Sequence, residues 1–243
     1  RDRLRSRGLG DVYKRQVHQQ SPKERDDPVK LDTLTIDIGA SSKAEAEKYV
    51  SLGDCAYFTS DYTELGNGYL REKALDDRIG CAIMVDILNK NLPYDVTCVF
   101  TVQEEIGTRG AKVAAYTVKP DYAIVLETTT ACDFAGNDGE KRVCELGKGC
   151  VVSYMDRSTI YDRELYRLGF EKAKEINVPC QTKTLVAGGN DSGAIHSSVG
   201  GIRTVALSVP CRYLHSPSCM IKKSDVQSTA ELAYAMYLAL AEK

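Results

Sequence analysis

The chain has 243 residues, 43% hydrophobic and 27% charged, a composition typical of a globular protein with one large domain or two small ones. Its formal net charge of −2 gives no electrostatic argument for binding nucleic acid or an anionic membrane, and we see no apolar run long enough to cross a bilayer. Nine cysteines occur without a Cys-x-x-Cys pair or a recognisable secretion signal, so we expect reduced thiols and a cytoplasmic location.

Residues 1–16 differ in character from the rest of the chain. They are rich in arginine and show almost no apolar periodicity, which is typical of a disordered basic arm. They also resemble the translation of a sequencing adapter joined to a reading frame. We therefore expect this segment to be a disordered or non-native tail.

Residues 17–68 contain the signals of a small β-rich module. Too few strands are predicted here for an independently stable sheet, so we expect the module to be incomplete. The predicted features are an alternating strand at Leu34–Ile38, a capping box at Ser42–Glu45 opening a helix at Lys43–Ser51, a second strand at Cys55–Thr59, and a hairpin turn at Asn67-Gly68.

Residues 69–243 show strands alternating with helices, a pattern that predicts an α/β sandwich with a mostly parallel or mixed sheet. The predicted helices are Asp77–Lys90, Gly110–Val118, Asp162–Ile176, Ser192–Ser197 and Ser224–Glu242. The predicted strands are Tyr94–Gln103, Tyr122–Leu126, Val151–Tyr154, Thr182–Leu185 and Thr204–Val209.

Two adjacent carboxylates, Glu104 and Glu105, follow the predicted strand at Tyr94–Gln103. Neighbouring residues of a straight strand point to opposite faces, so both can line one site only where the chain bends into a loop. Such a pair could divide two tasks, one carboxylate holding a metal and the other moving a proton. The alternative is a solvated loop start.

Other acidic and imidazole side chains follow predicted strands or precede predicted helices. Each has a plain structural explanation when taken singly: a helix cap for Asp76, Asp77 or Asp191, and a solvated position for Glu127 or His215. Taken together, they indicate a divalent-metal site at the carboxyl edge of the sheet, with ligands that suit Zn²⁺, Co²⁺ or Mn²⁺.

Five ordered motifs resemble those of the tetrahedral, glutamyl-aminopeptidase-like metallopeptidases, whose members have often been labelled cellulase M or endoglucanase. The resemblance covers residues 17–243 and implies a mixed-sheet α/β/α zinc-peptidase catalytic domain at 69–243, with part of a β-rich dimerisation domain at 17–68. The motifs are Lys73-Ala-Leu-Asp-Asp-Arg-Ile-Gly80, Thr101-Val-Gln-Glu-Glu-Ile-Gly107, Met155-Asp-Arg-Ser158, Gly188-Gly-Asn-Asp-Ser-Gly-Ala-Ile-His196 and Arg212-Tyr-Leu-His-Ser-Pro217.

The resemblance also implies roles for individual residues. Asp76 would bridge two metal ions and be joined to Asp77 by a cis peptide bond. Glu104 would be the general base, Glu105 and His215 would hold one metal, and Glu127 would hold the other. The implied substrates are short peptides and the implied assembly is a homo-oligomer, a dimer-based dodecamer in the family.

One departure from the family pattern affects the expected activity. The family's remaining ligand is the histidine of a His-x-Asp segment, and the only early histidine here is His18, in Val17-His-Gln-Gln. We therefore expect an N-terminally truncated chain with weak or no catalysis. The alternative function is an inactive subunit that acts only in oligomer association. Glycoside hydrolysis fits less well, because the carboxylates are assigned to metal binding.

Overall fold

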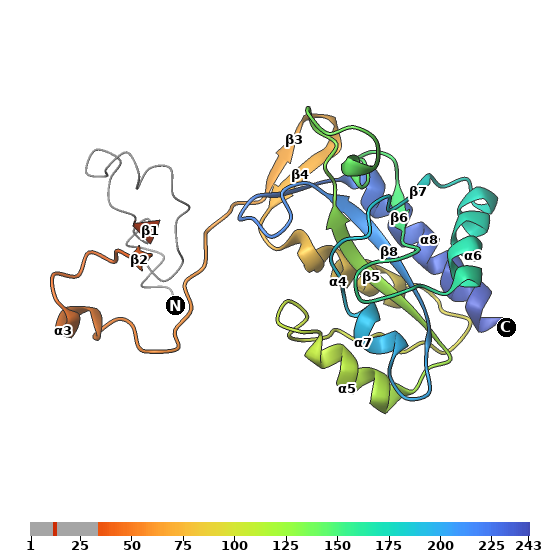
Figure 1. Cartoon of the computed structure of the whole chain (residues 1–243), viewed down its shortest axis with the longest axis horizontal. Coiled ribbons are helices and arrows are strands. Elements are labelled where there is room, and N and C mark those ends of the chain that lie inside the picture. The colour runs from red at the N-terminus through yellow and green to blue at the C-terminus, as the bar shows by residue number, and fades with distance from the viewer. Residues whose placement is uncertain (1–11, 14–33) are drawn as a thin grey trace. The chain divides into compact units, whose positions relative to one another are not determined.

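Residues 12–13 and 34–243 are described by the computed structural model, and the chain divides into two units, Arg1–Tyr57 and Phe58–Lys243. The expectations for residues 1–16 and for His18 therefore lie outside the described residues, apart from Val12 and Tyr13. The domain boundary predicted near Gly68 stays a prediction. In chain order the elements are β1 (Val12–Tyr13), β2 (Thr35–Ile36), α3 (Lys43–Ala46), β3 (Thr63–Leu65), η3 (Gly66–Gly68), β4 (Tyr69–Glu72), α4 (Leu75–Leu88), α5 (Arg109–Val118), β5 (Tyr122–Thr130), η4 (Gly139–Arg142), β6 (Cys150–Val152), α6 (Arg163–Glu175), β7 (Cys180–Thr182), α7 (Ser192–His196), β8 (Arg203–Cys211), β9 (Cys219–Lys222) and α8 (Lys223–Ala241) (Figure 1).

The first unit contains the antiparallel pair β1–β2 and the short helix α3. The Ser42 hydroxyl accepts a hydrogen bond from the Glu45 backbone N–H (3.2 Å), which confirms the predicted N-cap. The helix ends at Ala46, earlier than predicted. The strand predicted at Cys55–Thr59 is wrong, because this segment forms no strand and Tyr57 and Phe58 in it are exposed.

The second unit contains a mixed sheet with strand order β5-β8-β6-β7, which confirms the predicted α/β class. Strand β8 is parallel to β5 and antiparallel to β6. A separate antiparallel sheet has the order β3-β4-β9. Its β3–β4 hairpin turns through Gly66–Gly68, where Asn67 has a φ of 62°, and this confirms the predicted turn.

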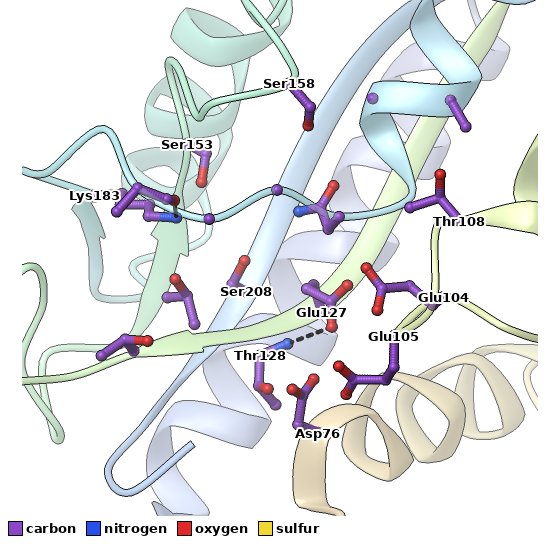
Figure 2. Close-up of a pocket in the computed structure, with 18 of the residues that line it drawn as sticks. Asp76, Glu104, Glu105, Thr108, Glu127, Thr128, Ser153, Ser158, Lys183 and Ser208 are labelled. Atoms are coloured by element: carbon purple, nitrogen blue, oxygen red, sulfur yellow. Dashed lines mark hydrogen bonds between the residues drawn. The ribbon is translucent and has the colours of Figure 1, made fainter. Parts of the chain in front are cut away.

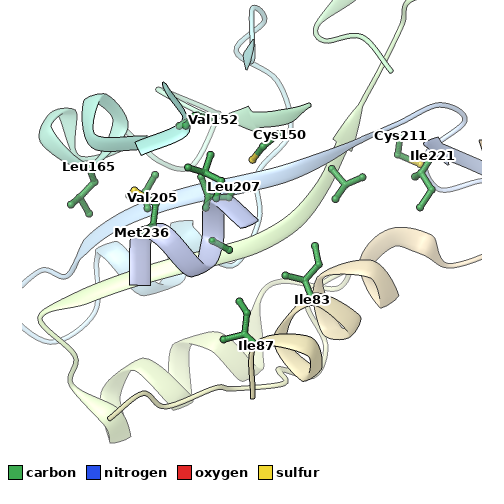
Figure 3. Close-up of a cluster of buried hydrophobic side chains, with 14 of the residues drawn as sticks. Ile83, Ile87, Cys150, Val152, Leu165, Val205, Leu207, Cys211, Ile221 and Met236 are labelled. Atoms are coloured by element: carbon green, nitrogen blue, oxygen red, sulfur yellow. The ribbon is translucent and has the colours of Figure 1, made fainter. Parts of the chain in front are cut away.

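Strand β8 lies at the centre of the main core because its side chains alternate between two packed faces. Its odd-numbered residues Val205, Leu207 and Val209 are fully buried against one layer of helices (Figure 3). That layer contributes Ile83 and Ile87 of α4, Leu165 of α6, and Leu232 and Met236 of α8. On the opposite face, Ala206 packs with Val125 of β5 and Ile195 of α7.

The predicted strand at Tyr94–Gln103 is wrong. Residues 95–101 form no strand, although the segment is apolar and β-branched as a strand would be. A strand needs a partner at a backbone spacing of about 4.8 Å. Here residues 95–101 and residues 122–127 of β5 both line a cavity of about 1030 Å³, and the only partner of β5 among the described strands is β8. Val96, Val99 and Phe100 are consequently exposed.

The central position of β8 predicts a large effect of truncating Leu207, which is 0% exposed. Leu207→Ala should lower the free energy of unfolding by about 2–5 kcal/mol, because it removes buried apolar surface and leaves a cavity. Urea denaturation followed by circular dichroism would measure this. Ile160→Ala, at a position 76% exposed, is the control and should have a much smaller effect. Equal effects of the two substitutions would contradict this description of the core.

Candidate metal site

All five predicted site residues line one cavity of about 1360 Å³ at the carboxyl end of β5 (Figure 2). They come from four separate segments of the chain and include Asp76, Glu104, Glu105, Glu127 and His215. The structure therefore brings together the side chains that the sequence analysis selected. Their individual roles stay predictions.

Glu127 is placed by the register of two parallel strands. It lies opposite Ser208 of β8 and on the same face of β5 as Val125, because side chains two apart in a strand share a face. Its side chain is 9% exposed, and Oε1 accepts a hydrogen bond from the Thr128 backbone N–H (3.1 Å). A rigid, buried strand thus fixes this carboxyl group.

Asp76 and Asp77 occupy the start of α4, where the backbone is not yet helical. Their peptide bond is cis, as the resemblance implied. Asp77 Oδ1 accepts a hydrogen bond from the Gly80 N–H (3.0 Å), so this side chain also acts as a helix cap. A side chain at Gly80 would collide with the Asp77 carboxyl group, which explains the glycine in this turn.

Glu104 and Glu105 lie on a tight loop between residues 102 and 110. The loop begins where Gln103 adopts a φ of 61°, and it is closed by a hydrogen bond from the Gly110 N–H to the Val102 carbonyl (3.0 Å). A Cβ atom at Gly110 would lie 2.6 Å from the Val102 backbone, so only glycine allows this approach. The bend lets both carboxyl groups line the same cavity, as predicted for a chain that leaves the straight strand geometry.

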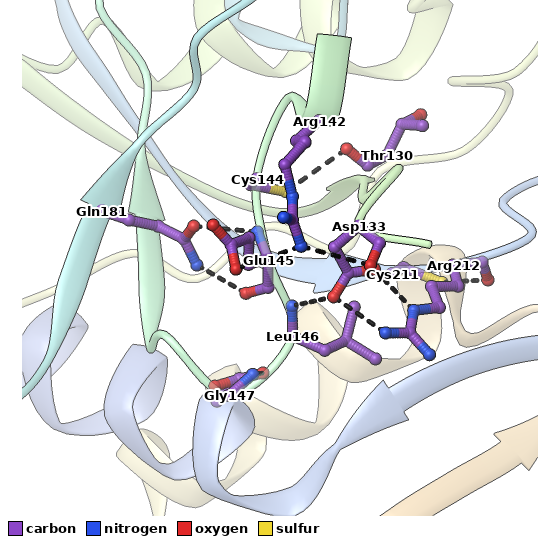
Figure 4. Close-up of polar contacts among 11 residues, drawn as sticks. Thr130, Asp133, Arg142, Cys144, Glu145, Leu146, Gly147, Gln181, Cys211 and Arg212 are labelled. Atoms are coloured by element: carbon purple, nitrogen blue, oxygen red, sulfur yellow. Dashed lines mark hydrogen bonds and ion pairs between the residues drawn. The ribbon is translucent and has the colours of Figure 1, made fainter. Parts of the chain in front are cut away.

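His215 is carried by the loop between β8 and β9. Its Nε2 lies 3.1 Å from Asp76 Oδ2 and 3.3 Å from Glu105 Oε2. The start of the loop is anchored by Arg212, whose guanidinium donates to both carboxylate oxygens of Asp133 (2.5 and 2.9 Å), while Asp133 also accepts from the Leu146 N–H (Figure 4). This bidentate ion pair fixes the segment that presents the imidazole.

Two overlapping groups of side chains have the spacing of metal ligands. One contains Asp76, Glu105 and His215, and the other contains Asp76, Asp77 and Glu127, with the ligand atoms of each group within 4.8 Å of one another. Burial, followed by repulsion from neighbouring carboxylates, raises the pKa of both Asp77 and Glu127 well above its ordinary value. Carboxylate oxygens and imidazole nitrogen at this spacing fit a divalent cation, which would relieve the repulsion.

Glu104 belongs to neither ligand group. Burial, together with the negative charges of Glu105, Asp191 and Asp76, raises its pKa to about 7. A carboxyl group that titrates near neutral pH can both accept and return a proton in the same reaction cycle. Glu104 therefore lies beside the two ligand groups without belonging to either of them.

Two further acidic side chains lie near the site, and the sequence assigned neither of them a ligand role. Asp77 was part of the acidic set that indicated a metal site but was given no ligand role of its own, and its carboxyl group belongs to the second ligand group. The preferred role of Asp191, capping the helix at Ser192, is wrong, because its side chain makes no cap hydrogen bond. Asp191 Oδ2 instead accepts from the Thr101 hydroxyl (2.6 Å), and its buried Oδ1 has no hydrogen-bond partner among the described residues. Its position after two glycines gave no signal for this contact.

The sequence model of the M42 glutamyl aminopeptidase family matches residues 5–232. A putative aminopeptidase of Acetivibrio thermocellus is 41% identical over 206 residues, which cover 84% of this chain and 62% of that protein. The chain thus spans less than two thirds of the length of this relative.

Solved structures of the same kind resemble the fold. A TET aminopeptidase from the marine sediment archaeon Thaumarchaeota archaeon SCGC AB-539-E09 matches with a TM-score of 0.89 and 32% identity, covering 93% of this chain and 66% of that chain. The TET1 peptidase of Pyrococcus horikoshii, which can assemble into a tetrahedron or a large octahedral shell, matches with a TM-score of 0.72 and 33% identity, covering 86% and 60%. No helix among the described residues is long and apolar enough to cross a membrane.

The raised pKa values predict how the metal-free chain responds to pH. The folded state retains protons on Asp77 and Glu127 that the unfolded state, in which these groups have their ordinary pKa values of 3.8 and 4.5, releases. Stability is therefore greatest at acidic pH and is lost as pH rises toward the raised values. With EDTA present, the melting temperature should fall between about pH 5 and pH 8, and Glu127→Gln should flatten this slope. A melting temperature that rises over this range would contradict the electrostatic description.

Proposed function

The chain belongs to the M42 glutamyl aminopeptidase family, and we propose on this basis that it hydrolyses the N-terminal residue of short peptides with the help of two divalent metal ions. The observation that carries the proposal is the separation of roles in one cavity. Five side chains are clustered at ligand spacing, four of which line this cavity, and Glu104 lines the same cavity outside both groups.

The two ligand groups support a dinuclear arrangement. Asp76 belongs to both groups, so it would bridge the two ions, with Glu105 and His215 on one side and Glu127 on the other. Asp77 lies beside Glu127 and would add its charge to the second position. Oxygen and imidazole ligands suit zinc, cobalt or manganese.

The chain's own residues would supply proton transfer and positioning. When bound, the metal ions would polarise the scissile carbonyl group and lower the pKa of a water molecule. Glu104 would then accept a proton from water and return it to the nitrogen of the departing peptide.

The proposal extends to partners and location. Short peptides fit a cavity of about 1360 Å³ that is lined by both polar and apolar residues. We propose a homo-oligomer, because the similar TET1 peptidase of P. horikoshii assembles into closed shells. The absence of nucleic-acid and membrane partners and the cytoplasmic location stay predictions.

Replacing Glu104 by Gln tests the proposed base. The amide cannot accept the proton, so the turnover of amino-acyl anilides should fall by about 10²–10⁴-fold, while the metal content stays close to that of the unmodified chain. Kinetics with Co²⁺ or Zn²⁺ and elemental analysis give the two readouts. Glu171→Gln, on the exposed side of α6, is the matched control and should change neither. An unchanged rate in Glu104→Gln would assign the base to another residue.

Metal titration separates the enzyme from an inactive subunit. Two tightly held ions per chain, reduced by Glu127→Gln, are expected if the two ligand groups form a complete dinuclear site. One weakly held ion per chain would instead support the alternative, a subunit that acts only in oligomer association. Isothermal titration calorimetry of the metal-free chain with Zn²⁺ or Co²⁺ measures the number of ions and their affinity.

A further inference from the structure

Asp156 is a buried carboxylate that contacts Ser158, a residue lining the cavity, and the proposed reaction does not use it. It is 3% exposed and accepts four hydrogen bonds. Oδ1 accepts from the Ser158 N–H (2.8 Å), the Ser158 hydroxyl (2.9 Å) and the Thr159 N–H (2.8 Å), while Oδ2 accepts from the Tyr161 hydroxyl (2.6 Å). An ionised carboxylate can only accept, so it fixes the direction of every hydrogen bond around it.

The direction of these bonds makes Ser158 a hydrogen-bond acceptor toward the cavity. The Ser158 hydroxyl proton goes to the charged Asp156 rather than to the Thr159 hydroxyl, which is farther away at 3.4 Å. The Thr159 hydroxyl can then donate to one lone pair of Ser158 Oγ, and the other lone pair is left for an outside donor. Ser158 is exposed and lines the cavity, and Figure 2 shows its oxygen directed toward the side where Glu127 lies.

The same reasoning makes Asn190 a donor. The Tyr161 proton is held by Asp156, so Tyr161 Oη accepts from Asn190 Nδ2 (3.3 Å). Asn190 Oδ1 accepts from the Ser192 N–H (2.9 Å), which can only donate, so the orientation of the amide is fixed. The second N–H of Asn190, which also lines the cavity, remains available to an outside acceptor.

The two groups are held rigidly next to each other. The Arg157 N–H donates to the Gly188 carbonyl (2.9 Å), which ties the turn containing Ser158 to the loop containing Asn190. A Cβ atom at Gly189 or Gly193 would lie 2.7 or 2.6 Å from Ser158 Oγ, so the turn and the loop are in direct contact. Preorganised polar groups of this kind bind a ligand at low entropic cost.

We propose that this wall binds the main chain of an extended peptide, with the N–H of one residue donating to Ser158 and the carbonyl of the same residue accepting from Asn190. A residue in extended conformation presents both groups on one edge, as in a strand pair. Asp156 is then a positioning residue that sets which side chain accepts and which donates. The inference rests on the proposed function only in taking a peptide as the ligand.

Calorimetry with a hydrolysis-resistant peptide tests the proposal. The probe is tetra-alanine whose first peptide bond is reduced to a methylene-amine, and it is titrated into the Co²⁺-loaded chain. Two analogues of the probe each carry a methyl group on one of the two remaining amide nitrogens. Ser158→Ala and Asn190→Asp should each weaken binding about 3- to 10-fold, the effect of one lost hydrogen bond. Ser224→Ala, at an exposed position in α8, is the matched control and should bind normally.

The methylated analogues distinguish a direct contact from a general structural effect. Methylation of the amide nitrogen that donates to Ser158 should weaken binding to the unmodified chain by a similar factor. It should weaken binding to Ser158→Ala no further, because the hydrogen bond is already lost there, but it should still weaken binding to Asn190→Asp. Asp156→Asn should show both losses. If that buried substitution prevents folding, as judged by the melting temperature, the two single variants still decide the question.

The outcomes separate this inference from the proposed function. Three results would each overturn the inference. The first is normal binding by both Ser158→Ala and Asn190→Asp, and the second is a methylation effect that adds to the effect of Ser158→Ala. The third is the absence of binding to the unmodified chain. If unmodified tetra-alanine is nevertheless hydrolysed, the proposed function stands without this inference. Coupled losses of binding in a chain that does not hydrolyse the peptide would support the inference and contradict the proposed function.

Discussion

Mutual repulsion among buried carboxyl groups is the constraint on which the rest of this structure depends. The carboxylate oxygens of Asp76, Asp77 and Glu127 lie within 4.8 Å of one another, and burial raises the pKa of Asp77 and Glu127. Such a cluster persists only where rigid elements hold it. Here a buried strand, the first turn of α4 and two anchored loops do so, and a divalent cation is the partner whose charge would balance the cluster.

The scaffold supplies this rigidity through β8. One face of β8 packs on α4, α6 and α8, which fixes β5 by parallel pairing and thereby fixes Glu127. The end of the same strand leads into the loop of His215, and Asp133 anchors that loop through Arg212. Asp156 accepts hydrogen bonds from the hydroxyl groups of Ser158 and Tyr161, and it thereby fixes which side chains beside the cavity donate and which accept. The candidate metal ligands and the proposed peptide-binding wall are therefore positioned by one core.

Much of this arrangement could be predicted from local sequence signals. Helix periodicity located α4, α5, α6 and α8, and apolar runs located β5 and β8, because those elements bury a face against the core. The segment Tyr94–Gln103 has the composition of a strand but lacks an adjacent partner, and pairing cannot be read from composition. Strand β7 was expected at Thr182–Leu185 but lies at Cys180–Thr182, where it pairs with β6. The contacts of Asp77 and Asp191 depend on tertiary structure, so single residues gave no signal for them.

Anomalous X-ray diffraction from crystals of the chain soaked in Co²⁺ is the most direct test of the central claim. The account predicts two peaks above the cobalt edge, one bounded by Asp76, Glu105 and His215 and the other by Asp76 and Glu127, with Glu104 oxygens outside the coordination distance of about 2.0–2.2 Å. Cobalt bound elsewhere with these carboxyl groups left unliganded would contradict the account, as would Glu104 bound directly to either ion.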